Sequence, residues 1–554
     1  MLQPQTPGPV PADTARVARA AFPKGSPLLT LRDELGAVFS DDDFAALYPG
    51  LGQPAYSPWR LALVTVLQFR EDLSDRRAAD AVRARIDWKY LLGLPLDDPG
   101  FDASVLCEFR ARLVDGAAEQ VLLDRVLAAC RDRGLLRKRG RQRTDATHVV
   151  ADIREMNRLE LASETVRAAL NALATEAPDW VRALARPEWF KHYGRRVEDT
   201  RLPQSKHGRA TRTVEVGADG YTILDAVDAD DAPPGLSTLP VVDALRRVWG
   251  RHYERGADGT VEALEISGRG PDKGDAVESP YDTDARFRRK RSTKWTGYAV
   301  HLTETCDEDR PRLVLHADTT PGDVHEARRT GPILAALDAR GLSASEHLVD
   351  AGYVSGGSLV AAQSDHGVRL VGPPRKNVRW QGQVEGGYTA DRFEIDWERE
   401  VATCPEGHES AGWYPFERAD GQRSITIRFR RSTCGPCPAR AVCVRSKTAA
   451  PAKTPFRSLH VSPKAEHEAR EAMRAEMETD EGQAAYAARS GIEGTISQGV
   501  RSTGMRRTRY RGLAKTHLGH VATAAALSAD RATAWLAGRP VAGTRTSRFA
   551  ALAA

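Results

Sequence analysis

The segment Asp145-Ala146-Thr147-His148-Val149-Val150-Ala151 marks the point where this 554-residue sequence changes from a helical to a strand-forming pattern. Apolar residues between 26 and 136 recur at helical spacing, most clearly at 61–69, 103–113 and 120–130. The β-branched and apolar residues of the segment itself favour a strand. We therefore predict an all-helical N-terminal domain, followed by a core that contains strands.

The residues that follow predict an α/β core in which an antiparallel pair of strands leads into crossover units. Strands are predicted at 296–304, 312–318, 347–350 and 368–372, and helices at 159–184, 241–253, 324–339 and 357–364. A helical pattern returns from residue 463 to about residue 536. The order of elements makes a mixed sheet the expected centre of the fold.

These patterns divide the chain into eight segments. They are a flexible tail (1–25), a helical DNA-binding or dimerisation domain (26–136), the first core strand (137–155), a helical and irregular insertion (156–285), the main core (286–376), a cysteine-rich insertion (377–460), a C-terminal helical part of the core (461–540) and a tail (541–554).

Composition excludes several classes of protein. Apolar residues make up 41% and charged residues 28%, which fits a globular protein with a sizeable core. No apolar run reaches the length of a membrane span, and the first 25 residues lack the apolar core of a signal peptide. Seven cysteines are too few for a disulfide scaffold. We expect a cytoplasmic protein of several domains that is not associated with a membrane.

The net charge of only +5 hides three basic clusters. The first lies at 137–143 and the second at 286–294, and the stretch 494–529 contains no Asp or Glu at all. Each run alone could be solvated surface, but three together favour a polyanionic partner.

Three carboxylates stand out by position. Asp145 lies in the first core strand, Asp350 ends the strand at 347–350, and Glu493 is the last acid before the long basic stretch. The carboxyl ends of strands are where open α/β sheets bind ligands. Three converging carboxylates would repel each other unless cations lay between them, and Mg²⁺ prefers such oxygen ligands. Position alone leaves other acids as rivals, namely Asp152, Glu155, Asp318 and Asp323.

A cluster of cysteines falls between residues 404 and 443. Its members are Cys404, Cys434, Cys437 and Cys443, with His408 as a possible substitute ligand. The Cys434-Gly-Pro-Cys437 turn can present two thiolates to one tetrahedral Zn²⁺. The alternative is a group of reduced free thiols in an inserted subdomain.

Several stretches, in this order, resemble the bacterial insertion-sequence DDE transposases. Residues 144–148 are similar to that family's first-Asp strand, and residues 347–353 to its second-Asp strand. The pattern Tyr486-x2-Arg489-x3-Glu493, with the basic stretch at 504–515, resembles its glutamate region. That signature expects Lys or Arg seven residues past the Glu, where this chain has Val500 and then Arg501.

The resemblance implies an RNase H-like mixed-sheet core with an N-terminal helical domain and inserted subdomains. It implies that Asp145, Asp350 and Glu493 hold two Mg²⁺ or Mn²⁺ ions and cut and join DNA at terminal inverted repeats. Joining two ends implies a homo-oligomer. Two alternatives remain open at this point: a domesticated DNA-binding protein without activity, and a metal-dependent nuclease without strand transfer.

The residues expected to contact DNA lie in the second and third basic runs. They are Arg288, Arg289, Lys290, Arg291, Lys294, Trp295, Arg489, Arg501, Arg506, Arg507, Arg509 and Lys515. Trp295 could stack on a displaced base or belong to the core at the start of a strand. Arg489, one helical turn before Glu493, could contact a phosphate or the carboxylate.

Overall fold

The computed structural model describes residues 1–200, 202–265, 276–375, 379–418, 421–444 and 456–539, together with residues 549 and 552. The rest of the predicted tail at 541–554 lies outside the described residues. Within these ranges, no helix combines the length and the apolar character that crossing a membrane requires.

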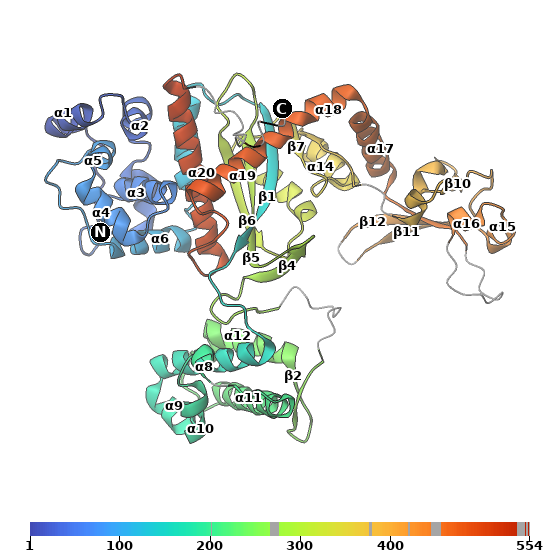
Figure 1. The fold of residues 1–554 in the computed structure, drawn as a ribbon, viewed down its shortest axis with the longest axis horizontal. Coiled ribbons are helices and arrows are strands. Elements are labelled where there is room, and N and C mark those ends of the chain that lie inside the picture. The colour runs from blue at the N-terminus through green and yellow to red at the C-terminus, as the bar shows by residue number, and fades with distance from the viewer. Residues whose placement is uncertain are drawn as a thin grey trace.

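Seven helices form the N-terminal region, at the blue end of the chain in Figure 1. They are α1 (Ala12–Ala21), α2 (Pro27–Leu35), α3 (Pro58–Arg70), α4 (Asp75–Ala84), α5 (Ile86–Leu92), α6 (Ser104–Asp115) and α7 (Val121–Asp132). The helical prediction for this region is confirmed. The flexible tail expected at 1–25 is wrong in part, because α1 buries Ala18 against Leu29 and Tyr90.

A six-stranded mixed sheet forms the centre of the molecule. Its strands are β1 (Arg141–Val150), β4 (Arg286–Lys290), β5 (Thr293–Thr305), β6 (Val314–Pro321), β7 (Glu346–Val349) and β8 (Arg369–Val371). β1 pairs antiparallel with β5 and parallel with β7, and β7 pairs parallel with β8. β4 and β6 pair with successive halves of β5 along its other edge.

The strand order β6-β5-β1-β7-β8, with two antiparallel pairings followed by two parallel ones, is that of an RNase H-like core. The crossover helices are α13 (Thr330–Ala339), between β6 and β7, and α14 (Gly356–His366), between β7 and β8. The predicted fold class is therefore confirmed.

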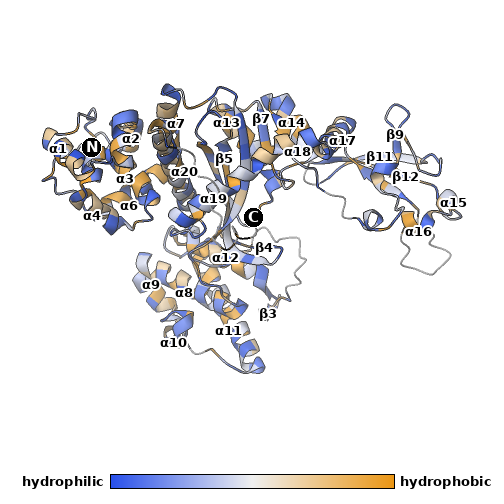
Figure 2. Ribbon diagram, turned by 45° about the horizontal axis from the view of Figure 1, so that its top comes forward, coloured by the Kyte–Doolittle hydropathy of each residue, from blue (hydrophilic) through white to orange (hydrophobic). Residues whose placement is uncertain are grey.

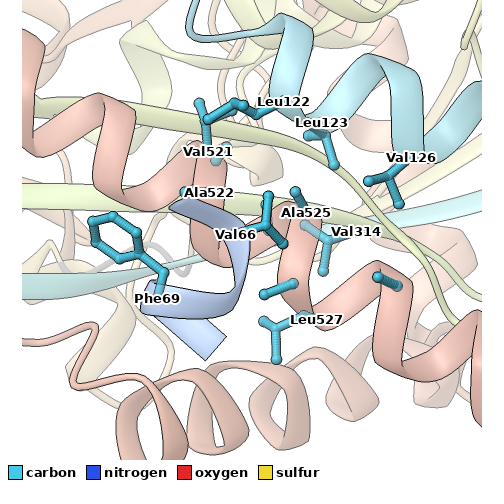
Figure 3. Packing of buried hydrophobic residues seen from close by; sticks show 14 of the residues in the cluster. Val66, Phe69, Leu122, Leu123, Val126, Val314, Val521, Ala522, Ala525 and Leu527 are labelled. Carbon is cyan, nitrogen blue, oxygen red and sulfur yellow. The ribbon is translucent and has the colours of Figure 1, made fainter. Parts of the chain in front are cut away.

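The N-terminal helices and the sheet share one hydrophobic core. The long helix α20 (Leu513–Leu536) lies between them and packs on α3, α7 and β6. Figure 3 shows Val66 and Phe69 of α3 and Val521 and Ala525 of α20 in this contact. The interior face of α20 is rich in alanine, which lets the neighbouring elements approach closely.

A separate helical subdomain follows β1 and has its own buried cluster. It contains α8 (Arg158–Glu176), α9 (Pro178–Leu184), α10 (Pro187–Tyr193), α11 (Lys206–Val227), α12 (Pro240–His252) and the short strands β2 (Tyr253–Arg255) and β3 (Val261–Ala263). The sequence did not predict α11, because its glycines weaken the helical pattern. Gly220 is required there, since a Cβ would lie 2.0 Å from the Trp249 ring.

The cysteine-rich insertion projects from the core as an arm (Figure 1). It contains β9 (Glu394–Asp396), β10 (Val401–Thr403), β11 (Gly412–Glu417), β12 (Arg423–Arg428), β13 (Ser458–Val461) and the short helices α15 (Arg431–Cys434) and α16 (Arg440–Cys443). β11, β12 and β13 form an antiparallel sheet over a small core of its own.

Three helices lead from this arm back to the sheet: α17 (Lys464–Glu478), α18 (Asp480–Ala487) and α19 (Gly491–Ser502). α17 packs on α14, and α19 packs on β1. Figure 2 shows α17 as largely hydrophilic and α3 as largely hydrophobic, in keeping with their exposed and buried positions. α19 therefore brings the segment around Glu493 to the centre of the sheet.

Candidate active site

Asp145 and Asp350 lie next to each other because of the register of two parallel strands. Thr144 of β1 pairs with Val349 of β7, and the next residue in each case is an aspartate, Asp145 after Thr144 and Asp350 after Val349. Asp350 directly follows β7, and its Oδ1 accepts a hydrogen bond of 2.6 Å from the Gly352 backbone. Two of the three predicted acids thus meet at one edge of the sheet.

Glu493 is brought to the same place through Arg489. The guanidinium of Arg489 lies 2.6 Å from Asp145 Oδ2 and 3.2 Å from Glu493 Oε1. Arg489 occupies the 3₁₀ turn between α18 and α19, and Glu493 is in the first turn of α19. The hydroxyl of Tyr486 donates to the Val349 carbonyl at 3.0 Å, which ties the end of α18 to the residue before Asp350.

These contacts give each member of the Tyr486-x2-Arg489-x3-Glu493 pattern a position at the acidic cluster. Of the two contacts expected for Arg489, a phosphate or the carboxylate, the structure shows the carboxylate. Arg489 contacts two carboxylates, Asp145 and Glu493. Its Nε is buried without a hydrogen-bond partner among the described atoms. The guanidinium is therefore held by its ion pairs and by a hydrogen bond to Glu493 Oε1, with its Nε left unbonded.

Asp145 is the most enclosed of the three acids, with 16% of its side chain exposed, against 65% for Glu493. Burial raises the pKa of Asp145 above its ordinary value, although the charge of Arg489 and the Ala146 backbone N–H act in the opposite direction. The nearby charge of Asp350 raises the pKa further. The guanidinium of Arg489 therefore favours the ionised form of Asp145 against the effect of burial.

A fourth carboxylate, Glu326, lies at the same edge and was missed in the sequence. Glu326 follows β6 in the chain. Its side chain lies against Gly352, two residues after Asp350, because a Cβ added at Gly352 would be 3.3 Å from Glu326 Oε2. Lys290 binds its Oε1 at 2.8 Å, and Arg288 lies 3.4 Å from Oε2. The basic residues at 286–294 were the available signal, because two of them need a buried counter-ion.

Replacing Glu326 by glutamine is expected to lower the free energy of unfolding by about 2 kcal/mol at pH 7, because buried Arg288 loses its charge partner. Burial would raise the pKa of Glu326, but the hydrogen bond and charge of Lys290, with the charge of Arg288, hold it at about 2. Because the pKa of Glu326 is lower in the folded protein than its ordinary value of 4.5, the ionised carboxylate stabilises the fold at pH values above 4.5. This stabilisation is lost as the pH falls from 4.5 towards 2.

Urea unfolding of wild type and Glu326→Gln at pH 7 and at acid pH checks this expectation. The difference between the two proteins should narrow as the pH is lowered below about 5. An equal difference at both pH values would contradict the role given to the ionised carboxylate.

Two of the rival acids have other partners. Asp318 is bound by Arg329, with an Nε–Oδ2 distance of 2.7 Å. Asp152 lies 3.8 Å from Arg511 at the start of the helical subdomain. Neither contact involves Arg489 or Asp350.

The residues fit a divalent cation by the chemistry of their oxygens, and Arg489 already places a positive charge between two of them. Among the residues that the structure describes, however, no three His, Cys, Asp or Glu side chains are close enough to hold an ion together. Binding of metal would therefore require the carboxylates to close and Arg489 to move.

The first basic run, at 137–143, is only partly available to a ligand: Lys138 and Arg139 are exposed and have no ion pair with any described residue, whereas the other three positive charges are paired. Arg143 is 2% exposed and binds Glu304, with an Nε–Oε1 distance of 2.7 Å. Arg141 binds Glu346 at 2.8 Å, and Arg137 binds Asp309 at 2.8 Å. The paired residues of this run therefore hold β1 in the fold.

The other two runs are only partly available to a ligand. Arg288 and Lys290 are paired with Glu326, and Arg509 is paired with Asp72. The remaining predicted contacts are exposed and have no ion pair with any described residue: Arg289, Arg291, Lys294, Arg501, Arg506, Arg507 and Lys515. Three of these lie in the β4–β5 hairpin. Lys290 of the same hairpin is near enough to Asp145 that its charge opposes the rise in the pKa of Asp145 caused by burial.

The proposed stacking of Trp295 on a base is corrected by its burial. Its side chain is 5% exposed, and its Nε1 donates to the Tyr298 carbonyl at 3.0 Å. The ring packs beside His148, with 5.3 Å between the centroids. Trp295 is therefore a core residue at the start of β5.

The four clustered cysteines line one cavity in the arm, together with His408. The backbone N–H of Cys404 donates to the His408 carbonyl at 2.9 Å, which closes the turn between them. All four thiols are free, although they surround the same space. Burial raises the pKa of Cys443 to about 11, so its thiolate would need a cation nearby.

The fold and the acidic cluster define an RNase H-like protein with a carboxylate site where Asp145, in the middle of β1, lies beside Asp350 at the carboxyl end of β7. Residues 403–531 match a family model described as a transposase DDE domain, and residues 16–112 match one described as a transposase domain (DUF772). Comparison with curated proteins and with solved structures gave no significant match. The two matches support a DNA transposase function and are consistent with an insertion-sequence DDE transposase.

The DDE match contains Glu493 and the cysteine cluster, whereas Asp145 and Asp350 precede it. The transposase class implies that the chain binds DNA.

Proposed function

We propose that the chain cuts DNA at the ends of its insertion sequence and joins the freed ends to target DNA at the site of Asp145, Asp350 and Glu493. The observation that supports this most strongly is that Arg489 links Asp145 to Glu493 beside the two paired strands β1 and β7. The three acids come from parts of the chain that are far apart in the sequence. An ion pair that only stabilised one helix would involve neighbouring residues.

In this proposal the three carboxylates bind two Mg²⁺ or Mn²⁺ ions, which would activate the attacking oxygen and stabilise the leaving oxygen of a phosphodiester. Arg489 holds Asp145 and Glu493 together before the ions bind, and it then becomes available to a phosphate. The exposed Arg289, Arg291 and Lys294 would hold the DNA backbone beside the site. The hydroxyl of Tyr486 keeps α18 against β7 throughout.

One assay tests the proposal and separates it from its alternatives. Wild-type protein is incubated with labelled terminal-repeat DNA, target plasmid and Mg²⁺ or Mn²⁺. The proposal predicts cleavage at the repeat end, followed by joined product. Cleavage without joining would indicate a nuclease, and binding without cleavage under any metal would indicate a domesticated DNA-binding protein.

Joining two ends requires that both be held at once, so we propose a homo-oligomer in the complex with DNA. Size measurement of the protein with and without terminal-repeat DNA tests this directly. A monomer bound to one end throughout the reaction would contradict it.

We further propose that Cys404, Cys434, Cys437 and Cys443 hold a structural Zn²⁺ in the arm. Their shared cavity supports this, and a metal would add stability to the small core of the arm. The thiols would have to close around the ion, because among the described residues no three metal-ligating side chains are close enough to hold one.

Metal analysis of purified protein is expected to give about one zinc per chain. The double variant Cys434→Ser/Cys437→Ser should lose this zinc, whereas Cys107→Ser, which replaces an exposed cysteine on α6, should retain it. Equal zinc content in both variants would contradict the proposed ligands.

A further inference from the structure

The outer face of the β11–β12–β13 sheet differs sharply from its inner face. Cross-strand pairing puts Trp413, Ile427 and Leu459 in one row, and these residues pack into the core of the arm. The opposite face carries the row Tyr414, Thr426 and His460. A sheet with one buried face is ordinary, but the exposed face here is rich in aromatic and basic groups.

Two large aromatic side chains lie on this outer face. Tyr414 is 49% exposed, and Phe416, two residues further along β11, is 39% exposed. The Tyr414 ring lies over Gly412, because a Cβ at Gly412 would be 2.6 Å from the ring. Because Gly412 has no side chain, the Tyr414 ring can pack flat against the strand at this position.

Positive charge surrounds these rings. The guanidinium carbon of Arg428 lies 5.0 Å from the centre of the Tyr414 ring, and Arg418 follows β11 directly. Burial, with the charges of Arg379, Arg418 and Arg428, lowers the pKa of His460 in the same face. Neither Arg418 nor Arg428 forms an ion pair with any described residue, and both are exposed.

Two of the three strands of this sheet carry no negative charge, and the one acid of β11, Glu417, alternates with Tyr414 and Phe416 and so belongs to the other face. There is no Asp or Glu between Gly421 and Ala465, a stretch that includes all of β12 and β13. A solvated surface in a chain with 75 acidic residues would normally mix the two signs. A basic face with exposed rings matches a strand of nucleic acid, whose phosphates meet arginine while its bases stack on aromatic side chains.

We propose that this outer face, defined by Tyr414, Phe416, Arg418, Arg428 and His460, binds a single strand of DNA with unpaired bases. An unpaired strand is favoured over a duplex because the rings offer flat surfaces, and the bases of a duplex are already stacked on one another. The inference rests on the proposed function only for the source of the strand, which would be DNA opened at the cut end.

The test measures binding of full-length protein to a fluorescein-labelled oligothymidylate of 20 nucleotides and to a duplex of equal length, without divalent metal. Tyr414→Thr/Phe416→Thr, which keeps residues suited to a strand, is expected to weaken single-strand binding at least about tenfold. Duplex binding should change less than about twofold. Phe190→Thr, at an exposed aromatic on α10, is the matched control and should bind as wild type does.

A second variant tests the charges. Arg418→Gln/Arg428→Gln should lower the slope of log affinity against log salt by about 1.4 for the single strand, or about 0.7 for each phosphate contact. An unchanged slope would overturn the proposal. Unchanged single-strand affinity in the aromatic variant, or an equal loss for duplex, would do the same.

These outcomes are independent of catalysis. Binding is measured without divalent metal, where no cleavage takes place, so failure of the cleavage assay and failure of this inference are distinguishable. Thermal unfolding of the aromatic variant, expected to match wild type because both rings are exposed, shows that lost binding does not come from lost folding.

Discussion

Replacing Asp350 by asparagine is expected to lower the rate of DNA cleavage at least about 10³-fold, because the site loses a charged oxygen ligand between two other carboxylates. Asparagine keeps the shape of the side chain, and its amide oxygen can still accept the hydrogen bond from the Gly352 backbone. The local turn after β7 should therefore remain. Cleavage of labelled terminal-repeat DNA in Mg²⁺, measured in single turnover, gives the rate.

The matched control for this substitution is Asp365→Asn, an exposed aspartate on α14. It should cleave at the wild-type rate. DNA binding without metal should be no weaker in Asp350→Asn than in wild type, since the substitution removes a negative charge that repels phosphate. A rate for Asp350→Asn within tenfold of wild type would remove Asp350 from the catalytic site.

The second large effect is expected at Glu304, which lies at the centre of a buried ionic network. Its side chain is 0% exposed and binds Arg143 of β1 and Arg531 of α20, the latter at 2.7 Å. The Thr495 hydroxyl of α19 also donates to it. Glu304 of β5 thus connects the first strand to both C-terminal helices.

Glu304→Gln should lower the free energy of unfolding by about 3–5 kcal/mol, because it leaves buried Arg143 without a counter-ion. Urea unfolding checks this value. Glu308→Gln, four residues later on the exposed loop after β5, should change the free energy by less than about 0.5 kcal/mol. Equal effects of the two substitutions would show that the network contributes no stability.

Several core strands could be predicted because they carry apolar residues, whereas the basic strand β4 was not predicted. Among the predicted strands, β7 is an example: His347, Leu348 and Val349 are all buried, and a turn follows at once. α11 could not be predicted, because its glycines make room for Trp249 and Tyr253, which are distant in the sequence. Helical pattern alone does not report such a contact.

The candidate site shows the same division. Asp145, Asp350 and Glu493 were predicted from their positions and from the family resemblance. The register of β1 and β7 places Asp145 beside Asp350, and Arg489 bridges Asp145 to Glu493. Glu326 was missed because its role depends on Lys290 and Arg288, which reach it across the sheet. Local charge density was misleading at 137–143, where Arg143 is internal, since a sequence does not show where the counter-ions fold.

The most direct test of the three-carboxylate site is equilibrium binding of Mn²⁺, followed by electron paramagnetic resonance of the free ion. We predict that wild type binds Mn²⁺ and that Asp145→Asn, Asp350→Asn and Glu493→Gln each weaken this binding strongly, whereas Asp365→Asn does not. If the three variants bind Mn²⁺ as tightly as wild type, the carboxylates around Arg489 are not the metal site, and the central claim is wrong.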